Sequence, residues 1–148
     1  MKKLLTFVLP LLTALSSCAQ DVPQSLVPSV VVNAFQQKFP KASDIEWEKK
    51  GDLYEVEFDL AYKDHKAWMD AAGKMVKHKE EIDKADLPAP VKATLQKGFS
   101  QYKIDDAKRI ETEGLVIYKV EVENAMEEKK IYLDGEGKII EPKASYDN

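Results

Sequence analysis

Apolar and acidic residues alternate along residues 54–60, and a similar alternation returns along residues 116–123. Successive side chains of a β-strand point to opposite sides of the sheet, so each stretch predicts a strand with one buried face and one face in water. A shorter strand is expected before each of these stretches, and two more are expected after it. These additional strands are predicted at residues 45–49, 65–69 and 74–79 in the first half, and at residues 107–111, 129–133 and 138–141 in the second.

A helical pattern precedes each group of predicted strands. Pro28 and Pro88 stand just before these patterns, and proline suits the first turn of a helix, where its missing N–H would have no partner anyway. Three apolar residues then follow at intervals of four, which places them on one face of a helix that can pack on the apolar face of its own sheet. The apolar stripes are Val31, Phe35 and Phe39 in the first half, and Val91, Leu95 and Phe99 in the second.

The two halves of the chain repeat one another. Residues 27–39 align with residues 87–99, and residues 54–76 align with residues 118–140. Both copies of the second stretch end in Asp-x-x-Gly-Lys, a turn in which glycine can supply a positive φ. Each copy therefore predicts one helix followed by a four-stranded antiparallel sheet. We expect an α+β fold, a tandem duplication whose units join edge to edge with both helices packed on one face of the sheet.

The first residues follow the pattern of a secretory signal. The basic segment Met1–Lys3 precedes an apolar run, residues 4–15, that is too short to span a bilayer. The sequence Leu-Ser-Ser-Cys that ends at Cys18 resembles a bacterial lipobox, so we expect a lipid on Cys18; ordinary cleavage after Ala19 is the alternative. The expected divisions are a signal peptide of the lipoprotein type (residues 1–17), a tether (18–26), a first repeat (27–83) and a second repeat (84–148).

Composition and charge narrow the classes of function. The 148 residues are 44% hydrophobic and 32% charged, which is typical of a globular domain. Loss of Lys2 and Lys3 with the leader takes the net charge from −4 to −6, and no basic patch stands out, so nucleic acid is not an expected partner. Cys18 is the only cysteine, which excludes a disulfide within the chain.

The sequence offers little catalytic chemistry. His65 and His78 are the only histidines, and they are expected on neighbouring strands in a structural or solvated role rather than as metal ligands. Nucleophilic catalysis needs a base and an orienting group, and no such set, phosphate loop or zinc motif is visible. We therefore expect no enzyme, no metal and no cofactor. Carboxylates form rows that are expected to point to water and could attract a cation or a basic partner: Glu55 with Glu57, and Glu121 with Glu123.

Aromatic residues give the sharpest binding hypothesis. Trp68 and Tyr132 hold matching positions in the two repeats, and both point away from the helices if Ala67 and Ile131 face the core. Exposed Trp and Tyr side chains are enriched at the centres of protein interfaces. The alternative is a flipped strand, which would bury both rings. Tyr62, Lys130 and the four carboxylates of the acidic rows are expected to flank this surface, with Trp47 at its rim.

These features together resemble the PepSY-like family, also described as β-lactamase-inhibitor-like. The matching residues are Val27-Pro28 and Leu87-Pro88, Phe39-Pro40, the pairs Tyr54/Val56 and Tyr118/Val120, and the two Asp-x-x-Gly-Lys turns. The resemblance covers residues 27–141 and implies an exported tandem protein, often a lipoprotein, whose sheet is a recognition surface. The related inhibitor fold presents a concave sheet to an enzyme. That inhibitory activity is not carried over, because no inhibitor-specific loop motif is present.

The expected function is a non-catalytic, inhibitor-like binding module of the cell envelope. It would recognise a protein or peptide through the open face of its sheet, and a lipid on Cys18 would hold it to a membrane on the periplasmic side or at the cell surface. A soluble secreted or periplasmic protein is the alternative for location. A sensor or carrier for a small ligand or cation is the alternative for function.

Overall fold

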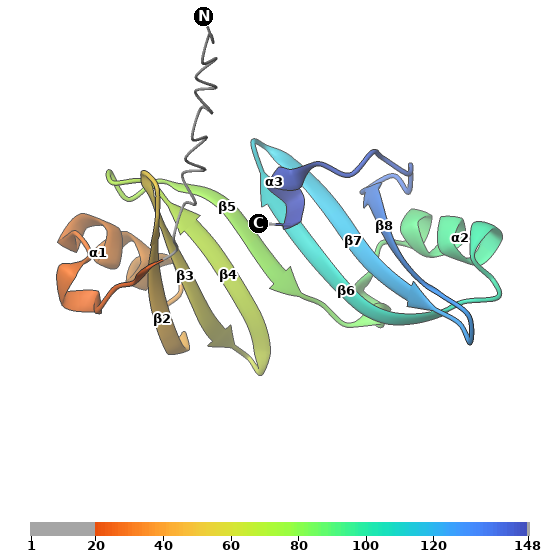
Figure 1. Cartoon of the computed structure of the whole chain (residues 1–148), viewed down its shortest axis with the longest axis horizontal. Helices are drawn as coiled ribbons and strands as arrows, with labels where there is room; N and C mark the ends of the chain where they lie inside the picture. Colours follow the sequence, from red (N-terminus) through yellow and green to blue (C-terminus); the bar gives the residue numbers. More distant parts are fainter. Residues whose placement is uncertain (1–19, 148) are drawn as a thin grey trace, which may run out of the picture.

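The computed structural model describes residues 20–147, which form one antiparallel sheet of eight strands in the order β1 to β8 (Figure 1). Strand β1 has two residues, and the seven that follow are longer. The strands are β1 (Gln20–Asp21), β2 (Ser43–Lys50), β3 (Leu53–Leu60), β4 (Lys63–Met69), β5 (Met75–Glu81), β6 (Lys103–Thr112), β7 (Leu115–Glu123) and β8 (Glu128–Asp134). The helices are α1 (Ser29–Lys38), α2 (Ala89–Gly98) and α3 (Ala144–Asp147), with 3₁₀ turns η1 (Gln24–Leu26) and η2 (Lys84–Asp86). The α+β class is confirmed.

The first unit packs helix α1 against strands β2–β5. Helix α1 begins directly after Pro28 and ends at Lys38, and its apolar stripe lies on the face of β2–β5. Phe35 meets Trp47 and Phe58 in edge-to-face contacts, with ring centroids 5.3 Å and 4.9 Å apart. Such aromatic contacts stabilise a core beyond the area that they bury.

The second unit repeats this arrangement with smaller side chains. Helix α2 begins directly after Pro88, and Val91 and Leu95 pack on Val120 and Leu133 of β7 and β8. The two units join through β5 and β6, which pair from Lys77 opposite Thr112 to Glu81 opposite Lys108. The predicted edge-to-edge joining is therefore confirmed, and the sheet is continuous across it.

The prediction of a fourth strand at residues 138–141 of the second unit is wrong. Only a single bridge forms there, between Leu133 and Ile139. Pro142 stands 64 positions after His78, which lies in the middle of β5. Because proline has no N–H and cannot extend a ladder, the strand stops, and the chain turns away to form α3.

The segment that we expected to be a tether spans residues 18–26. Its residues from Gln20 onward are part of the fold: β1 pairs with β2, and the Val22 N–H donates to the Trp47 carbonyl at 2.8 Å. Cys18 and the leader lie outside the described residues. None of the helices in residues 20–147 has the length and apolar character needed to cross a membrane.

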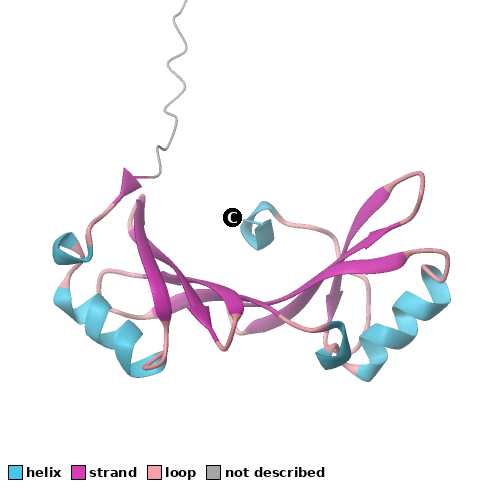
Figure 2. Cartoon of the chain, turned by 90° about the horizontal axis from the view of Figure 1, so that it is seen from below, coloured by secondary structure: helices cyan, strands magenta, loops and turns pink. Residues whose placement is uncertain are grey.

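The sheet is curved, and its two faces differ. Helices α1 and α2 lie against the convex face, whereas the short α3 lies in the hollow of the opposite face (Figure 2). We call this opposite side of β2–β8 the inner face. Within residues 20–147, no helix lies over β2–β4 on this side, whereas α3 crosses the second unit, for which the expectation of a bare side is wrong.

Candidate functional site

Carboxylates predominate on the first strands of the inner face, and lysines predominate on its central strands. The register of the sheet and the alternation of side chains place carboxylates on β2 and β3, and lysines on β4 to β7. The carboxylates are Glu46, Glu48, Glu55, Glu57 and Asp59. The lysines are Lys66, Lys77, Lys79, Lys108 and Lys119. The inner face thus has a mainly acidic side, which also carries Lys50, and a mainly basic centre, which also carries Asp64, Glu81, Asp106 and Glu121.

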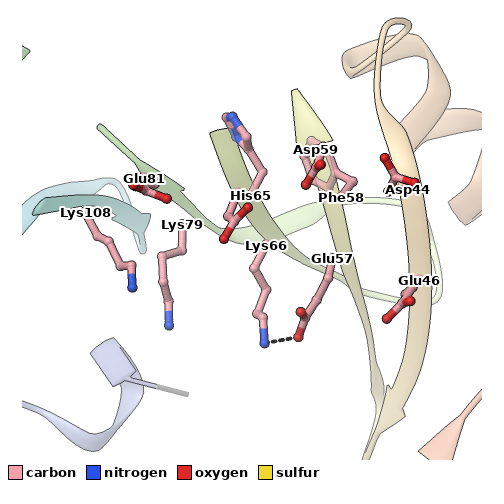
Figure 3. Close-up of a pocket in the computed structure, with 11 residues that line it drawn as sticks. Asp44, Glu46, Glu57, Phe58, Asp59, His65, Lys66, Lys79, Glu81 and Lys108 are labelled. Atoms are coloured by element: carbon pink, nitrogen blue, oxygen red, sulfur yellow. Dashed lines mark ion pairs between the residues drawn. The ribbon is translucent and has the colours of Figure 1, made fainter. Parts of the chain in front are cut away.

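A hollow of about 420 Å³ lies where the acidic and basic groups meet. Lys66, Lys79 and Lys108 project into it side by side from β4, β5 and β6, and Glu57 and Glu46 line it from β3 and β2 (Figure 3). Burial and the neighbouring lysines lower the pKa of Lys79. Lys66 forms an ion pair with Glu57, drawn as the dashed line in Figure 3.

Glu55 lies beneath this surface rather than in water, so its predicted exposure is wrong. Its side chain is 1% exposed, and its Oε1 accepts from Lys50 Nζ at 2.7 Å and lies 3.0 Å from Lys66 Nζ. Burial alone would raise the pKa of this carboxyl, but the hydrogen bonds from the two lysines lower it. The carboxylate is therefore an ionised structural group, and only its Oε2 atom has no partner.

Trp68 and Tyr132 lie on the predicted face, but the prediction that they are exposed is wrong. Trp68 is 5% exposed, because the side chain of Lys77 on the next strand lies over its ring, with Nζ 4.1 Å from the ring centroid. Tyr132 is 4% exposed because the C-terminal segment covers it. Neither ring is available as the exposed centre of an interface.

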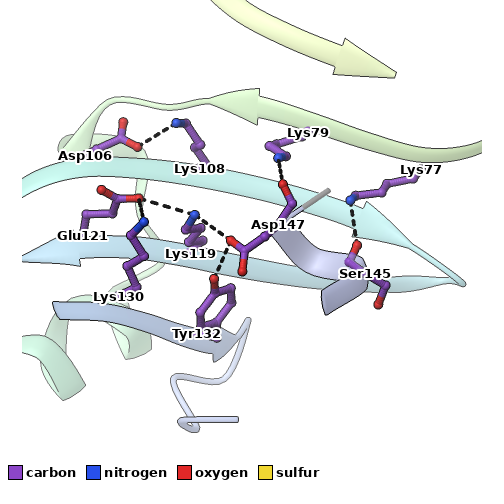
Figure 4. Close-up of polar contacts among 10 residues, drawn as sticks. All are labelled: Lys77, Lys79, Asp106, Lys108, Lys119, Glu121, Lys130, Tyr132, Ser145 and Asp147. Carbon is purple, nitrogen blue, oxygen red and sulfur yellow. Dashed lines mark hydrogen bonds and ion pairs between the residues drawn. The ribbon is translucent and has the colours of Figure 1, made fainter. Parts of the chain in front are cut away.

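Helix α3 covers the inner face of the second unit through the side chain of Tyr146 and through a set of polar contacts. Figure 4 shows these polar contacts. Tyr146 is 4% exposed and packs with Ile110, Ile117 and Tyr132. The Asp147 carboxylate accepts from Lys119 Nζ at 2.7 Å and from the Tyr132 hydroxyl at 2.6 Å.

Two more lysines hold the main chain of the same segment. Lys77 Nζ donates to the Ser145 carbonyl at 2.6 Å, and Lys79 Nζ donates to the Asp147 carbonyl at 2.9 Å. Figure 4 shows both lysines reaching the segment from β5. Main-chain carbonyls are present in every peptide, so these two contacts do not depend on the side chains of the segment.

The ionisation of these groups is coupled. Burial and the Asp147 hydrogen bond raise the pKa of Tyr132 to about 12. Burial would raise the pKa of Asp147, but hydrogen bonds from Lys119 and Tyr132 lower it. Burial lowers the pKa of Lys77 to about 8. At neutral pH Asp147 therefore carries its charge and Tyr132 keeps its proton.

The remaining predicted residues lie apart from one another. Trp47 belongs to the first core instead of a rim, so that prediction is wrong. Tyr62 is fully exposed, but it lies in the turn between β3 and β4. Lys130 and Glu121 face each other across β8 and β7 on the inner face, 3.8 Å apart. Glu123 is exposed at the end of β7.

The two histidines lie on the helix side of the sheet, on the neighbouring strands that we predicted. His65 Nδ1 and His78 Nε2 are 3.1 Å apart and the ring centroids are 5.3 Å apart, so the two rings meet end to end through one hydrogen bond. Burial lowers the pKa of both, that of His78 to about 4. Glu80 lies beside them, 3.9 Å from His65, but is also paired with Arg109 at 3.2 Å. Neither ring reaches the inner face as a base.

Sequence reasoning missed the apolar floor under α3. Ile110 and Ile117 are buried on the inner face, opposite the helix-facing residues of the same strands. A signal for Ile117 was present, because residues 115–118 are continuously apolar, and such runs are typical of strands buried on both faces. No comparable signal in residues 144–147 indicates that they pack on a sheet.

Comparison with known families accounts for this architecture. The family described as beta-lactamase-inhibitor-like, PepSY-like matches the chain twice, over residues 14–65 and over residues 52–141. The chain belongs to this PepSY-like family. The resemblance proposed from the sequence is confirmed, and the two matches agree with its repeated pattern. A comparison with curated proteins found no match.

Solved structures from Bacteroides species share the fold. A DUF2874 family protein of Bacteroides uniformis superposes with a TM-score of 0.68 at 21% identity, covering 77% of this chain and 86% of the other. A protein of Bacteroides eggerthii described as periplasmic gives 0.69 at 18% identity, over 78% and 86%. A BLIP-like protein of Bacteroides fragilis gives 0.65 at 22% identity, over 77% and 83%. At these identities the likeness concerns the fold.

Proposed function

We propose that this PepSY-like chain is a non-catalytic, inhibitor-like binding module that recognises a protein or peptide partner through the inner face of its sheet. One observation carries the proposal. The part of the inner face that α3 leaves open is a hollow lined by lysines of β4–β6 and by carboxylates of β2–β5. A fixed pattern of both charges favours a partner with the complementary arrangement and disfavours others.

The side chains on this surface suit recognition better than catalysis. The lysines and carboxylates of the hollow neutralise one another in pairs such as Lys66 with Glu57 and Lys108 with Asp106. The two histidines are buried on the other side of the sheet. General acid–base catalysis needs a titratable group that touches the substrate. Burial lowers the pKa of Lys77 to about 8, but this side chain lies under the C-terminal segment.

The same proposal places the protein in the cell envelope. The leader and the lipobox-like sequence support export and a lipid on Cys18, and the Bacteroides eggerthii protein of the same fold is described as periplasmic. Lipid chains contribute about 0.8 kcal/mol per buried CH₂, so more than one chain gives stable anchoring. The Cys18→Ala variant should leave the membrane fraction, while its partner binding in solution should remain.

A capture experiment with matched charge reversals tests the surface. The full chain serves as bait in an envelope extract, with Lys108→Glu and Lys130→Glu on the inner face as test variants. Lys38→Glu and Lys97→Glu carry the same change on exposed positions of α1 and α2 and serve as controls. The inner-face variants should lose partners that wild type and both controls retain. Equal capture by all four variants would show that the inner face is not the binding surface.

The alternative of a cation carrier has weaker support. The closest carboxylate cluster, Glu48, Glu55 and Glu57, is already paired with Lys50 and Lys66, which would compete with a cation. The other cluster places Glu80 beside the two histidines, whose nitrogens point at each other rather than toward a shared point. Both clusters are better explained as structural networks.

A further inference from the structure

The surface beneath α3 is a small apolar site with a basic rim. Ile110 and Ile117 are almost fully buried there, and Tyr132 stands beside them with its hydroxyl turned to the segment. Lys77 and Lys119 border these apolar residues from β5 and β7. Without the segment this site would expose two isoleucines among lysines, which is the make-up of a peptide-binding pocket rather than of an ordinary wet sheet face.

The segment in this site is held at few points. Of residues 141–147 only Tyr146 is buried; the others are exposed, and the cores beneath α1 and α2 contain none of them. Tyr146 fills the apolar site, and Asp147 binds Lys119 and Tyr132. The two lysines of β5 donate hydrogen bonds to main-chain carbonyls of the segment. The sequence requirement is therefore short: an aromatic side chain followed by a carboxylate.

We propose that residues 144–147 are a resident ligand of the inner face, and that the site beneath them receives a partner segment in which an aromatic residue is followed by an acidic one. This inference rests on the proposed function and adds the chemistry of the partner and its regulation. The partner segment takes the places of Tyr146 and Asp147, and the chain's own segment must leave first. The resident segment acts as an intramolecular competitor.

The strength of this competition follows from the short connection between β8 and α3. Ile140 is still bound to β8, because its N–H donates to the Tyr132 carbonyl, so only residues 141–143 separate this fixed point from α3, and so short a linker gives an effective concentration on the order of 1 mM. For a peptide that binds the empty site with a Kd of about 0.1 mM, the apparent Kd is then about tenfold weaker in the wild-type chain. A partner with additional contacts to the open hollow overcomes this factor.

A peptide titration on the full chain tests the inference. The probe is a fluorescent synthetic peptide with the sequence of residues 141–148, and binding is followed by fluorescence anisotropy. The receptor is either wild type or the double variant Tyr146→Ala/Asp147→Asn, which empties the site without shortening the chain. We expect the double variant to bind the probe about tenfold more tightly than wild type. A control probe that carries the same two substitutions should bind neither receptor.

Two further variants keep the test decisive. Adding Lys119→Met to the double variant should abolish probe binding, because the carboxylate loses its cation. If the double variant unfolds, as judged by circular dichroism, Asp147→Asn alone retains the Tyr146 packing and should still bind the probe more tightly than wild type, by about threefold.

The inference is overturned if the emptied chain binds the probe no better than wild type, or if the control probe binds equally well. This failure differs from failure of the proposed function. If the chain does not bind the peptide but the Lys108→Glu variant loses its envelope partner, the partner still binds through the open hollow. If the chain binds the peptide but every charge variant captures the same partners as wild type, the peptide site is supported and binding through the open hollow is refuted.

Discussion

Alanine in place of Gly137 is expected to destabilise the protein strongly, because this glycine is pressed against the start of α2. Its φ is +80°, and a Cβ atom there would lie 2.4 Å from the Pro90 carbonyl oxygen. Gly73 holds the matching position in the first unit, with φ of +82° and a Cβ distance of 2.9 Å to the Val30 carbonyl oxygen. The repeated Asp-x-x-Gly-Lys turn is therefore a packing site for the helix as well as a turn.

The turn itself leaves little room to relax. The Asp134 side chain accepts from the main-chain N–H groups of Glu136 and Lys138, both at 3.0 Å, and Thr94 of α2 donates to the Gly137 carbonyl at 2.7 Å. A residue with a side chain pays about 1–2 kcal/mol in the left-handed region. Overpacking against backbone atoms adds about 1–3 kcal/mol. Loss of chain entropy in the unfolded state offsets about 0.4–1 kcal/mol, so Gly137→Ala should cost about 1–4.5 kcal/mol.

The two turns supply an internal comparison. Gly73→Ala meets a less severe contact and should cost less than Gly137→Ala, about 1–3 kcal/mol. Gly135→Ala changes the same turn at a position where a Cβ meets nothing within 4 Å and where φ is not positive, so it should fall within about 0.5 kcal/mol of wild type.

Urea unfolding followed by far-UV circular dichroism measures these differences, with an unchanged m-value as the check that only stability has changed. The predicted clash with α2 is refuted if the free energy of unfolding of Gly137→Ala lies within about 0.5 kcal/mol of the wild-type value. It also fails if Gly135→Ala is as damaging, because the effect would then belong to the turn in general rather than to the contact with α2.

Three further predictions concern buried groups. The pKa of His78 is about 4 in the folded protein and 6.5 ordinarily, so its contribution to stability is full above pH 6.5 and should fall by up to about 3 kcal/mol toward pH 4. The variant His78→Asn should reduce this pH dependence in urea titrations at several pH values. Glu55, whose pKa is lowered from 4.5, acts in the same direction at lower pH: Glu55→Gln should cost about 1–3 kcal/mol at pH 7, and this cost should shrink as the pH falls below 4.5, whereas a cost that does not change with pH would rule out the ion pairs as its cause. Trp68→Ala should cost about 3–5 kcal/mol by urea unfolding, as for a core residue, whereas a loss below about 1 kcal/mol would mean an exposed ring.

Local pattern was enough for the parts of the fold that depend on neighbours in sequence. The stripes of α1 and α2 predict their buried faces because helical spacing determines which residues align. The alternation along β3 and β7 likewise predicts which residues face the helices. Trp47 could have been placed by the same rule, because Glu46 and Glu48 flank it on β2 and belong to the wet side.

Burial on the inner face depended on contacts that sequence spacing does not reveal. Alternation placed Trp68 and Tyr132 on the correct side, but what covers them comes from elsewhere in the chain. Lys77 reaches Trp68 from the next strand, and its ammonium group lies over the ring while it donates to the Ser145 carbonyl. Tyr146 reaches Tyr132 from a segment that has no strand pattern.

The difference between the two units begins at one residue. His78 continues β5 into the contact with β6, whereas Pro142, at the matching position, cannot donate to a ladder and ends the repeat early. The chain that would have formed a fourth strand is then free to cross the edge of β8 and fold onto the inner face as α3. One unit therefore presents an open, charged hollow, and the other presents a site filled by its own C-terminal segment. Under the proposed function, a partner that engages both units must displace that segment, so the early end of the second repeat would make binding unequal in the two halves of this duplicated protein.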